Sequence, residues 1–390
     1  MKTLMLLGLF LSSLLASCQK DLSEYYTYSV PEFVNDGLDT GSLESVGMDS
    51  NMLAKAIGRI WANKYDQIHS ILIYKDGLLV FEEYMEGNRY AWDGQYYYGD
   101  RIKWTRDSLH QIMSCTKSVT SACIGIAIEK GFIQSVHQSI FDYLPKHQQF
   151  NTGEKSTITI EHLLTMTSGL QWNEWSAPHG TSLNDIDRLY IECYNDPVYC
   201  VLERPLVSTP GELFTYNGGG LITLGEILRN ATGMNIVDFS KKYLFGPMGV
   251  DTLQWDAYPN GEIEAAGGLH LKPRDMLKLG VTYLNGGVWN GERILPEDWV
   301  KKSSVVYNNN AGISIPIEDS GKNGYGYTWW TSVVGRTGDK VNMFRANGWG
   351  GQVIMVLPEK EMVVVFTGGN YVTKSSLFEI LERFILPASS

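Results

Sequence analysis

The chain has 390 residues, enough for two or three domains or for one large domain. Hydrophobic residues make up 44% of the sequence and charged residues 19%, which describes a soluble globular chain with a sizeable core. The net charge of −11 and the lack of a long basic run argue against a nucleic-acid partner.

The first 17 residues resemble the signal peptide of an exported bacterial lipoprotein. Lys2 supplies a positive start, and residues 4–15 form an apolar stretch too short to span a bilayer in a mature protein. Residues 15–18 read Leu-Ala-Ser-Cys and are similar to a lipobox, in which the cysteine becomes the lipidated first residue. We therefore expect Cys18 to anchor the protein to a membrane, in the periplasm or at the cell surface. An ordinary signal peptide cut nearby is the alternative.

Hydrophobic periodicity predicts strands at the two ends of the chain and helices between them. The first part contains, in order, a tether, a helix, two strands joined by a hairpin turn, and an aromatic loop, at residues 18–44, 48–63, 68–74 with 78–84, and 86–106. The middle part is mainly helical, with helices at residues 159–170, 221–232 and 236–244. The last part has strands and a final helix, at residues 325–334, 352–357, 362–367 and 375–385. This order predicts one sheet built from both termini, with a helical region inserted between them.

The most informative stretch is residues 113–131, which predict a buried helix with a polar start. Small and apolar residues run from 119 to 128, and Gly131 is a suitable helix stop. Ser114 and Lys117 are three residues apart at the start of this helix, so they share a face. A serine beside a lysine can become a nucleophile if the lysine loses its proton, which burial and a helix N-terminus both favour. Ser-x-x-Lys alone is weak evidence, because most such pairs lie on a helix surface.

The expected state of the cysteines depends on the expected export of the protein, because exported proteins can form disulfides. Cys115 and Cys123 are eight residues apart on one predicted helix, too far to bond each other, and are expected to be core residues. Cys193 and Cys200 flank Asp196-Pro197 and could close a short loop. The sequence leaves a disulfide and two free thiols as equal alternatives for this second pair.

Five segments of the chain are similar, in sequence and in order, to the landmarks of a known enzyme family. They are residues 114–118 (Ser-Cys-Thr-Lys-Ser), 162–170 (His-Leu-Leu-Thr-Met-Thr-Ser-Gly-Leu), 210–216 (Pro-Gly-Glu-Leu-Phe-Thr-Tyr), 267–275 (Gly-Gly-Leu, then Arg-Asp) and 346–352 (Ala-Asn-Gly-Trp-Gly-Gly-Gln). They resemble the penicillin-recognising serine hydrolases, which include class C β-lactamases, D-alanyl-D-alanine carboxypeptidases, esterases and 6-aminohexanoate-dimer hydrolases.

The resemblance covers about residues 45–387 and implies the fold. This is an α/β (α+β) fold of the β-lactamase/transpeptidase type, in which helices flank an antiparallel sheet. The sheet part would comprise about residues 45–120 and 266–387, and the mainly helical part about residues 121–265.

Two motifs depart from the usual pattern of the family. Its second motif is usually Tyr-x-Asn, but Tyr216-Asn217-Gly218 has glycine in the third place. Its third motif is usually Lys-Thr-Gly or His-Thr-Gly, but residues 348–351 read Gly-Trp-Gly-Gly. Together with residues 107–110 (Asp-Ser-Leu-His), these changes make the chain most similar to the 6-aminohexanoate-dimer hydrolase and esterase branch.

The resemblance also implies a role for each residue of the site. Ser114 would attack a carbonyl group and form an acyl-enzyme, while Lys117 and Tyr216 move protons. The oxyanion hole would consist of the backbone N–H groups of Ser114 and Trp349. We expect the substrate to contact Trp172, Trp175, Asn217 and Gly350. Core packing is the alternative for the two tryptophans.

The sequence therefore predicts a serine hydrolase that cleaves a small ester, amide or short peptide, with no cofactor and no metal ion. No His-Glu-x-x-His, paired Cys-x-x-Cys, Gly-x-Ser-x-Gly or Walker motif supports another enzyme class. His110 and His162 are expected to be structural hydrogen-bonding residues. A D-Ala peptidase or β-lactamase and a non-catalytic binding or sensor lipoprotein on the same scaffold are the alternatives, and the sequence leaves the oligomeric state open.

Overall fold

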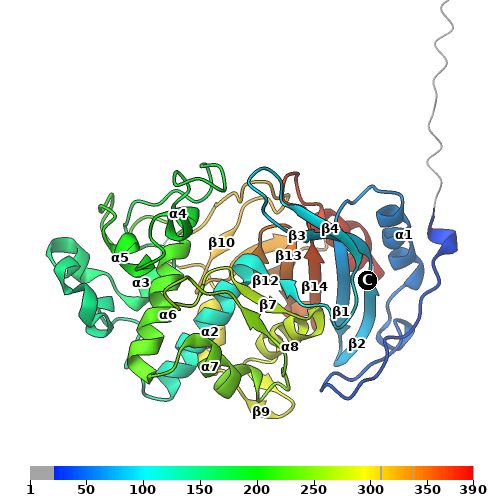
Figure 1. Ribbon diagram of the computed structural model, residues 1–390. Helices are drawn as coiled ribbons and strands as arrows, with labels where there is room; N and C mark the ends of the chain where they lie inside the picture. The colour runs from blue at the N-terminus through cyan, green and yellow to red at the C-terminus, as the bar shows by residue number, and fades with distance from the viewer. Residues whose placement is uncertain (1–21, 308–309, 337, 390) are drawn as a thin grey trace, which may run out of the picture.

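A seven-stranded antiparallel sheet forms the centre of the computed structural model, which describes residues 22–307, 310–336 and 338–389 (Figure 1). Its strand order is β10-β11-β12-β13-β14-β1-β2. These strands are β1 (Ile68–Lys75), β2 (Leu78–Tyr84), β10 (Gly324–Tyr325), β11 (Trp330–Val334), β12 (Val341–Gly348), β13 (Gln352–Leu357) and β14 (Met362–Gly368). The pairing of β1 with β14 joins the two ends of the chain in one sheet, as predicted.

Helices cover both faces of the sheet, and alternate strand residues pack into two separate cores. In β14, Val363 and Val365 belong to the core shared with α2 (Thr116–Glu129) and α8 (Pro273–Leu284). Val364 and Phe366 belong to the core shared with α1 (Ser50–Trp61) and the C-terminal helices α10 (Leu377–Ile380) and α11 (Leu386–Ala388). A strand covered on both faces is apolar along its whole length, which explains the continuous apolar run of β14.

The region between α2 and the C-terminal strands is mainly helical and lies to one side of the sheet (Figure 1). Its helices are α3 (Ile160–Leu164), α4 (Asp185–Ile191), α5 (Pro197–Leu202), α6 (Gly218–Thr232) and α7 (Ile236–Ser240). Three of them, α3, α6 and α7, confirm the helices predicted in this part of the chain. The short strands β5 (His110–Gln111), β6 (Gln254–Trp255) and β7 (Leu269–Leu271) pair beside the start of α2. A short hairpin and a helix follow α8, namely β8 (Val288–Trp289), β9 (Glu292–Arg293) and α9 (Glu297–Ser303).

Residues 86–106 contain a β-hairpin, so the prediction of a loop there is wrong. The hairpin consists of β3 (Glu86–Tyr90) and β4 (Tyr98–Lys103), which pair antiparallel. Only Gly87 of these two strands is fully buried, and the other side chains are exposed or half-buried. Strands without a buried face have no alternation of apolar and polar residues, and this removes the signal on which the prediction relied.

The N-terminal segment that the sequence interprets as a tether lies along the edge strand β2 where the structure describes it. The Tyr28 hydroxyl donates to the Val80 carbonyl at 2.9 Å, and the Tyr26 hydroxyl donates to Glu83 at 2.6 Å. Leu38 is buried in the main core. The signal peptide and Cys18 lie outside the described residues. None of the helices in the described ranges is long and apolar enough to cross a membrane.

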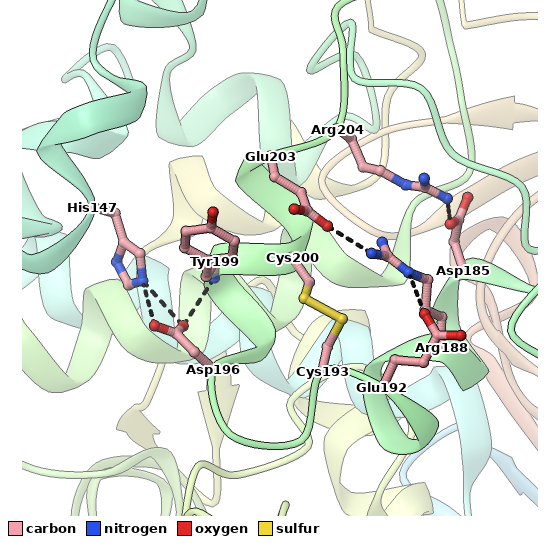
Figure 2. Close-up of a disulfide and its surroundings, with 10 residues drawn as sticks. All are labelled: His147, Asp185, Arg188, Glu192, Cys193, Asp196, Tyr199, Cys200, Glu203 and Arg204. Carbon is pink, nitrogen blue, oxygen red and sulfur yellow. Dashed lines mark hydrogen bonds and ion pairs between the residues drawn. A yellow bond between two sulfur atoms is a disulfide. The ribbon is translucent and has the colours of Figure 1, made fainter.

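Cys193 and Cys200 form a disulfide between α4 and α5, which decides between the two alternatives left open by the sequence (Figure 2). Their Cα atoms are 6.1 Å apart. Between them Asp196 caps α5 by accepting from the N–H of Tyr199, and it also accepts from His147 Nε2 at 3.1 Å (Figure 2). The other described cysteines, at positions 115 and 123, are buried and free, as expected.

Candidate active site

Ser114 lies in a single 3-10 turn, Met113–Cys115, that leads into α2. The turn contains Met113 with φ of +48°, a left-handed conformation that costs a non-glycine residue on the order of 1 kcal/mol or more. Such a conformation persists because the surrounding packing imposes it, and every residue from 116 to 127 is buried. The fold therefore holds the Ser114 side chain in the wall of a cleft, at a buried helix start.

Lys117 lies in the first turn of α2, three residues after Ser114, and contacts the Ser114 side chain directly. Its Nζ donates to Ser114 Oγ at 2.7 Å and to the Ala266 carbonyl at 3.0 Å. Only 2% of the residue is exposed. Burial lowers the pKa of Lys117 below its ordinary value, and the carboxylates of Glu174 and Glu264 oppose that shift in part. The result is an amine that loses its proton more easily than an exposed lysine, in hydrogen-bond contact with a hydroxyl group.

Tyr216, which lies just before α6, packs beside Lys117 and Ser114. Lys117 Nζ lies 5.0 Å from the centroid of its ring, and the indole of Trp175 stacks on the ring at 4.9 Å. Burial and then the charge of Glu174 raise the pKa of Tyr216 well above its ordinary value, while a hydrogen bond with Ser114 lowers it. The phenol is therefore neutral near pH 7 and is able to donate a proton beside the nucleophile.

Two carboxyl groups complete the surroundings of Lys117, and sequence reasoning missed both. Glu264 accepts from the N–H groups of Ala266 and Gly267 at 3.0 and 2.7 Å, which holds the turn whose carbonyl faces Lys117. Burial raises the pKa of Glu264 to about 7, against the opposing effect of Lys117. Glu174 Oε1 lies 3.9 Å from Lys117 Nζ. The sequence indicates these two glutamates only by their position, because each lies within four residues of one of the five family segments.

The structure brings most of the predicted site residues to one cleft of about 940 Å³. The residues on its wall include Ser114, Lys117, Trp175, Tyr216, Trp349 and Gly350. Trp172 and Asn217 are not among the lining residues. The Trp172 indole is almost fully buried and donates to Glu174 at 2.8 Å, and Asn217 caps α6 by accepting from the N–H of Gly220 at 3.0 Å. These two side chains support the residues that line the cleft.

Residues 348–351, the third motif, pack closely against neighbouring segments at positions where only glycine fits. A Cβ on Gly348, the last residue of β12, would lie 2.4 Å from the carbonyl oxygen of Ile112, so only glycine allows this approach. Trp349 follows it on the cleft wall, and its indole donates to the Tyr371 carbonyl at 3.2 Å. Gly350 has φ of +85°, and a Cβ there would lie 2.2 Å from the Tyr371 ring. The glycine at 348 thus lets the end of β12 lie against the turn that carries Ser114.

The cleft wall is aromatic and acidic. Its rings include Tyr90, Tyr97, Trp175, Trp330, Trp349 and Tyr371, and its carboxyl groups are Glu174, Asp187, Asp256, Glu264 and Glu318. Among the described residues, Lys117 is the only lysine or arginine that lines it. Arg345 of β12 is fully buried, and Glu318 neutralises its guanidinium at 2.8 Å. Along the described part of the wall, the lysine in contact with Ser114 is therefore the one Lys or Arg cation, and the imidazole of His179 is already paired with Asp187 at 3.0 Å.

The histidines expected to be structural make structural contacts. His110 Nε2 lies 2.8 Å from His69 Nδ1 in a buried pair. His162 completes the capping box of α3 with Thr159, each accepting from the other's backbone N–H. Within the part of the chain that the structure describes, no three or more His, Cys, Asp or Glu side chains are grouped so that they could hold a metal ion.

A family model described as Beta-lactamase matches residues 69–371, which is most of the chain and includes the whole cleft wall apart from its last three residues. The chain belongs to the beta-lactamase family. The resemblance inferred from the motifs is thereby confirmed at the level of the family. Proteins similar to this chain have different printed activities: a 6-aminohexanoate-dimer hydrolase, a β-lactamase/D-alanine carboxypeptidase and a carboxylesterase.

The curated relatives are distant. The 6-aminohexanoate-dimer hydrolase of Paenarthrobacter ureafaciens is 24% identical over 274 residues, which cover 68% of this chain and 67% of that protein. Protein flp of Staphylococcus aureus is 29% identical over 132 residues, 34% of this chain and 25% of that protein. The chain thus spans only a quarter of the length of that relative.

Two solved structures confirm the predicted β-lactamase/transpeptidase-like fold. The β-lactamase/D-alanine carboxypeptidase from Yersinia pestis superposes with a TM-score of 0.63 at 16% identity, covering 85% of this chain and 96% of that one. A family VIII carboxylesterase superposes with a TM-score of 0.62 at 14% identity, covering 89% and 95%. At these identities the likeness concerns the fold alone.

Proposed function

We propose that this protein is a serine hydrolase that cleaves small carboxylic esters or amides through an acyl-enzyme on Ser114. The observation that carries the proposal is the 2.7 Å contact between Lys117 Nζ and Ser114 Oγ in a buried site. Because burial lowers the pKa of Lys117, a neutral amine is accessible, and the Ser114 hydroxyl can then donate along the same contact.

Acylation begins when Ser114 Oγ forms a bond to the substrate carbonyl carbon and its proton passes to Lys117 Nζ. The electron pair of the carbonyl double bond moves onto oxygen, where the N–H groups of Ser114 and Trp349 would stabilise the negative charge. The bond to the leaving group then breaks, and the leaving oxygen or nitrogen takes the Tyr216 phenol proton. Tyr216 recovers a proton from the Lys117 ammonium, so both groups return to their starting states.

Deacylation repeats these steps with water in place of Ser114. Water gives a proton to the Tyr216–Lys117 pair, adds to the acyl carbon, and releases the acid when Ser114 Oγ leaves and is protonated again. The pKa shifts suit this exchange. The raised pKa of Tyr216 keeps the phenol protonated and able to donate, and the lowered pKa of Lys117 makes the neutral, proton-accepting amine easier to form.

The charge of the cleft favours neutral acyl donors over β-lactams. Penicillins and cephalosporins carry a carboxylate, and the family's usual third-motif cation that would face it is absent from residues 348–351. Of the residues that the structure describes, five with carboxyl groups and one lysine line the cleft, and that lysine is already in contact with Ser114. An added carboxylate would therefore lose hydration without gaining a cation in return.

The experiment that tests this proposal is a substrate panel on the purified protein with Ser114→Ala as the control. The panel comprises p-nitrophenyl acetate and butyrate, nitrocefin, a D-Ala-D-Ala peptide and a 6-aminohexanoate dimer. We expect turnover of the activated esters and its loss in Ser114→Ala, which removes one hydroxyl and leaves the fold intact. Full activity in Ser114→Ala would overturn the mechanism. No turnover of any substrate would favour the non-catalytic binding protein.

A further inference from the structure

The second motif lacks a side chain at Gly218, and the carboxylate of Glu174 occupies the space that such a side chain would need. A Cβ built on Gly218 would lie 2.9 Å from Glu174 Oε2, and also 2.9 Å from Ile186 Cδ1. The Gly218 N–H donates to that same oxygen at 2.7 Å. Glycine at this position and glutamate at position 174 therefore depend on each other: a larger residue at 218 would push the carboxylate out of its place.

Glu174 is held firmly and aims one oxygen at the reacting groups. Its Oε2 accepts from both the Gly218 N–H and the Trp172 indole, whereas Oε1 lies 3.9 Å from Lys117 Nζ. Only 9% of the Glu174 side chain and 3% of the Lys117 side chain are exposed. A buried ion pair of this kind is screened little by solvent, so the charge of Glu174 acts strongly on its neighbours.

We propose that Glu174 is a positioning residue of the proposed hydrolase, which takes the place of the missing second-motif side chain and stabilises the ammonium form of Lys117. This inference rests on the proposed function. When Lys117 accepts the Ser114 proton, the new positive charge forms beside the Glu174 carboxylate. The same carboxylate fixes the start of α6 directly after Tyr216.

The pH dependence follows from the charges around Lys117. The groups that face it are Glu174 from the loop after α3, Glu264 from the turn before β7, Tyr216 before α6, and Ser114 and Cys115 from the 3-10 turn that precedes α2. A carboxylate favours the protonated lysine, so loss of the Glu174 charge lets Lys117 become neutral at lower pH. A base must be neutral to act, and the acid limb of kcat/KM would move to lower pH in response. At the same time the plateau rate would fall, because the ammonium formed during acylation loses a stabilising partner.

Glu174→Gln tests this directly, because the amide keeps the size of the side chain and one carbonyl oxygen for the two hydrogen bonds. With p-nitrophenyl butyrate we expect the acid limb of kcat/KM to shift about 1–3 pH units lower, the usual effect of an opposite charge within about 4–6 Å. Because Glu264 titrates near pH 7 in the same site, the limb is compared between variants and not assigned to one group. An unchanged limb, or a shift to higher pH, would overturn the inference.

Asp187→Asn is the matched control. Asp187 lines the same cleft, but it accepts from His179 Nδ1 at 3.0 Å and from the Gly180 N–H at 2.8 Å, away from Lys117. Its charge acts on Tyr90 and Tyr97. The acid limb should keep its position in this variant. An equal shift in both variants would show that the limb responds to the general charge of the cleft, which would also overturn the specific role of Glu174.

An exchange of side chains provides a second test that survives a poorly folding Glu174→Gln protein. Gly218→Asn alone should lower kcat/KM at least 10-fold, since the new side chain collides with Glu174 and Ile186. In a background that carries both Glu174→Gly and Ile186→Ala, the same substitution should raise kcat/KM, because the two side chains nearest to the new Cβ are shortened and a polar group returns. The same loss in both backgrounds would contradict the dependence of the two positions. Fluorophosphonate labelling of the unmodified chain and of Ser114→Ala distinguishes failure of the proposed function from failure of this inference. If Ser114 is not labelled, the proposed function is wrong, and the inference that rests on it is wrong too. If Ser114 is labelled but Glu174→Gln does not shift the acid limb, only the role of Glu174 is wrong.

Discussion

A carboxylate at the end of the acyl chain should make a substrate markedly worse, and a matched pair of esters measures the effect. The mono-p-nitrophenyl ester of adipic acid and p-nitrophenyl hexanoate have acyl chains of equal length and differ in one terminal charge. In the cleft that charge meets five carboxyl groups, and the one lysine on the wall is engaged by Ser114 and Ala266. Arg345 cannot serve, because it is fully buried and paired with Glu318.

The expected size follows from the missing partner. A hydrogen bond to a charged group is worth about 1.5–3 kcal/mol, so an unpartnered carboxylate should lower kcat/KM by about 10-fold to 100-fold. The assay follows p-nitrophenol release, with the rate of the Ser114→Ala protein subtracted as background. Added salt should narrow the gap, since it screens the more exposed carboxylates such as Asp256. Nitrocefin, which also carries a carboxylate, should give a lower kcat/KM than p-nitrophenyl butyrate. Equal or faster hydrolysis of the adipate ester would refute the reasoning from the charge of the cleft.

Three further results are expected. Lys117→Ala and Tyr216→Phe should each lower kcat for ester hydrolysis on the order of 10²-fold or more, the scale of a lost general acid or base, and wild-type rates in either variant would remove that residue from the mechanism. Cys193→Ala/Cys200→Ala should lower the free energy of unfolding in denaturant titrations by about 2 kcal/mol, from the entropy of the seven-residue loop that the disulfide closes, and should spare ester hydrolysis. We propose that Cys18 carries lipid, so Cys18→Ser should release the protein from membranes, and a mature N-terminus at another residue would count against it.

The sequence predicted the sheet and its helical insertion because their signals are local and strong. The runs that became β1 and β2 are apolar and joined by a turn signal, and Asp49 caps α1 as its residue type suggests. The hairpin of β3 and β4 was missed because its side chains are exposed or half-buried and only Gly87 is buried, so the two strands have no apolar face. A strand or helix was predicted correctly where burial of one of its faces, or of both, gives the sequence a recognisable pattern of apolar residues, and it was missed where no such pattern exists.

The site was predictable only where a motif marks it. Ser114, Lys117 and Tyr216 stand in recognisable segments, and the structure brings them into contact. Glu174 and Glu264 stand in no such segment, because their roles arise from chain crossings that bring distant loops to Lys117. Sequence spacing cannot show which glutamate in a loop turns inward. For the same reason Asn217, which the motif suggested as a substrate contact, was not recognisable as the cap of α6.

Whether Ser114 is the nucleophile can be measured from the mass of the protein after reaction with a fluorophosphonate, followed by peptide mapping. We expect one covalent adduct per chain, located on the peptide that contains Ser114. We also expect no adduct on Ser114→Ala and much slower labelling of Lys117→Ala. An adduct on another residue, or an unmodified chain under conditions that label a known serine hydrolase, would contradict this mechanism.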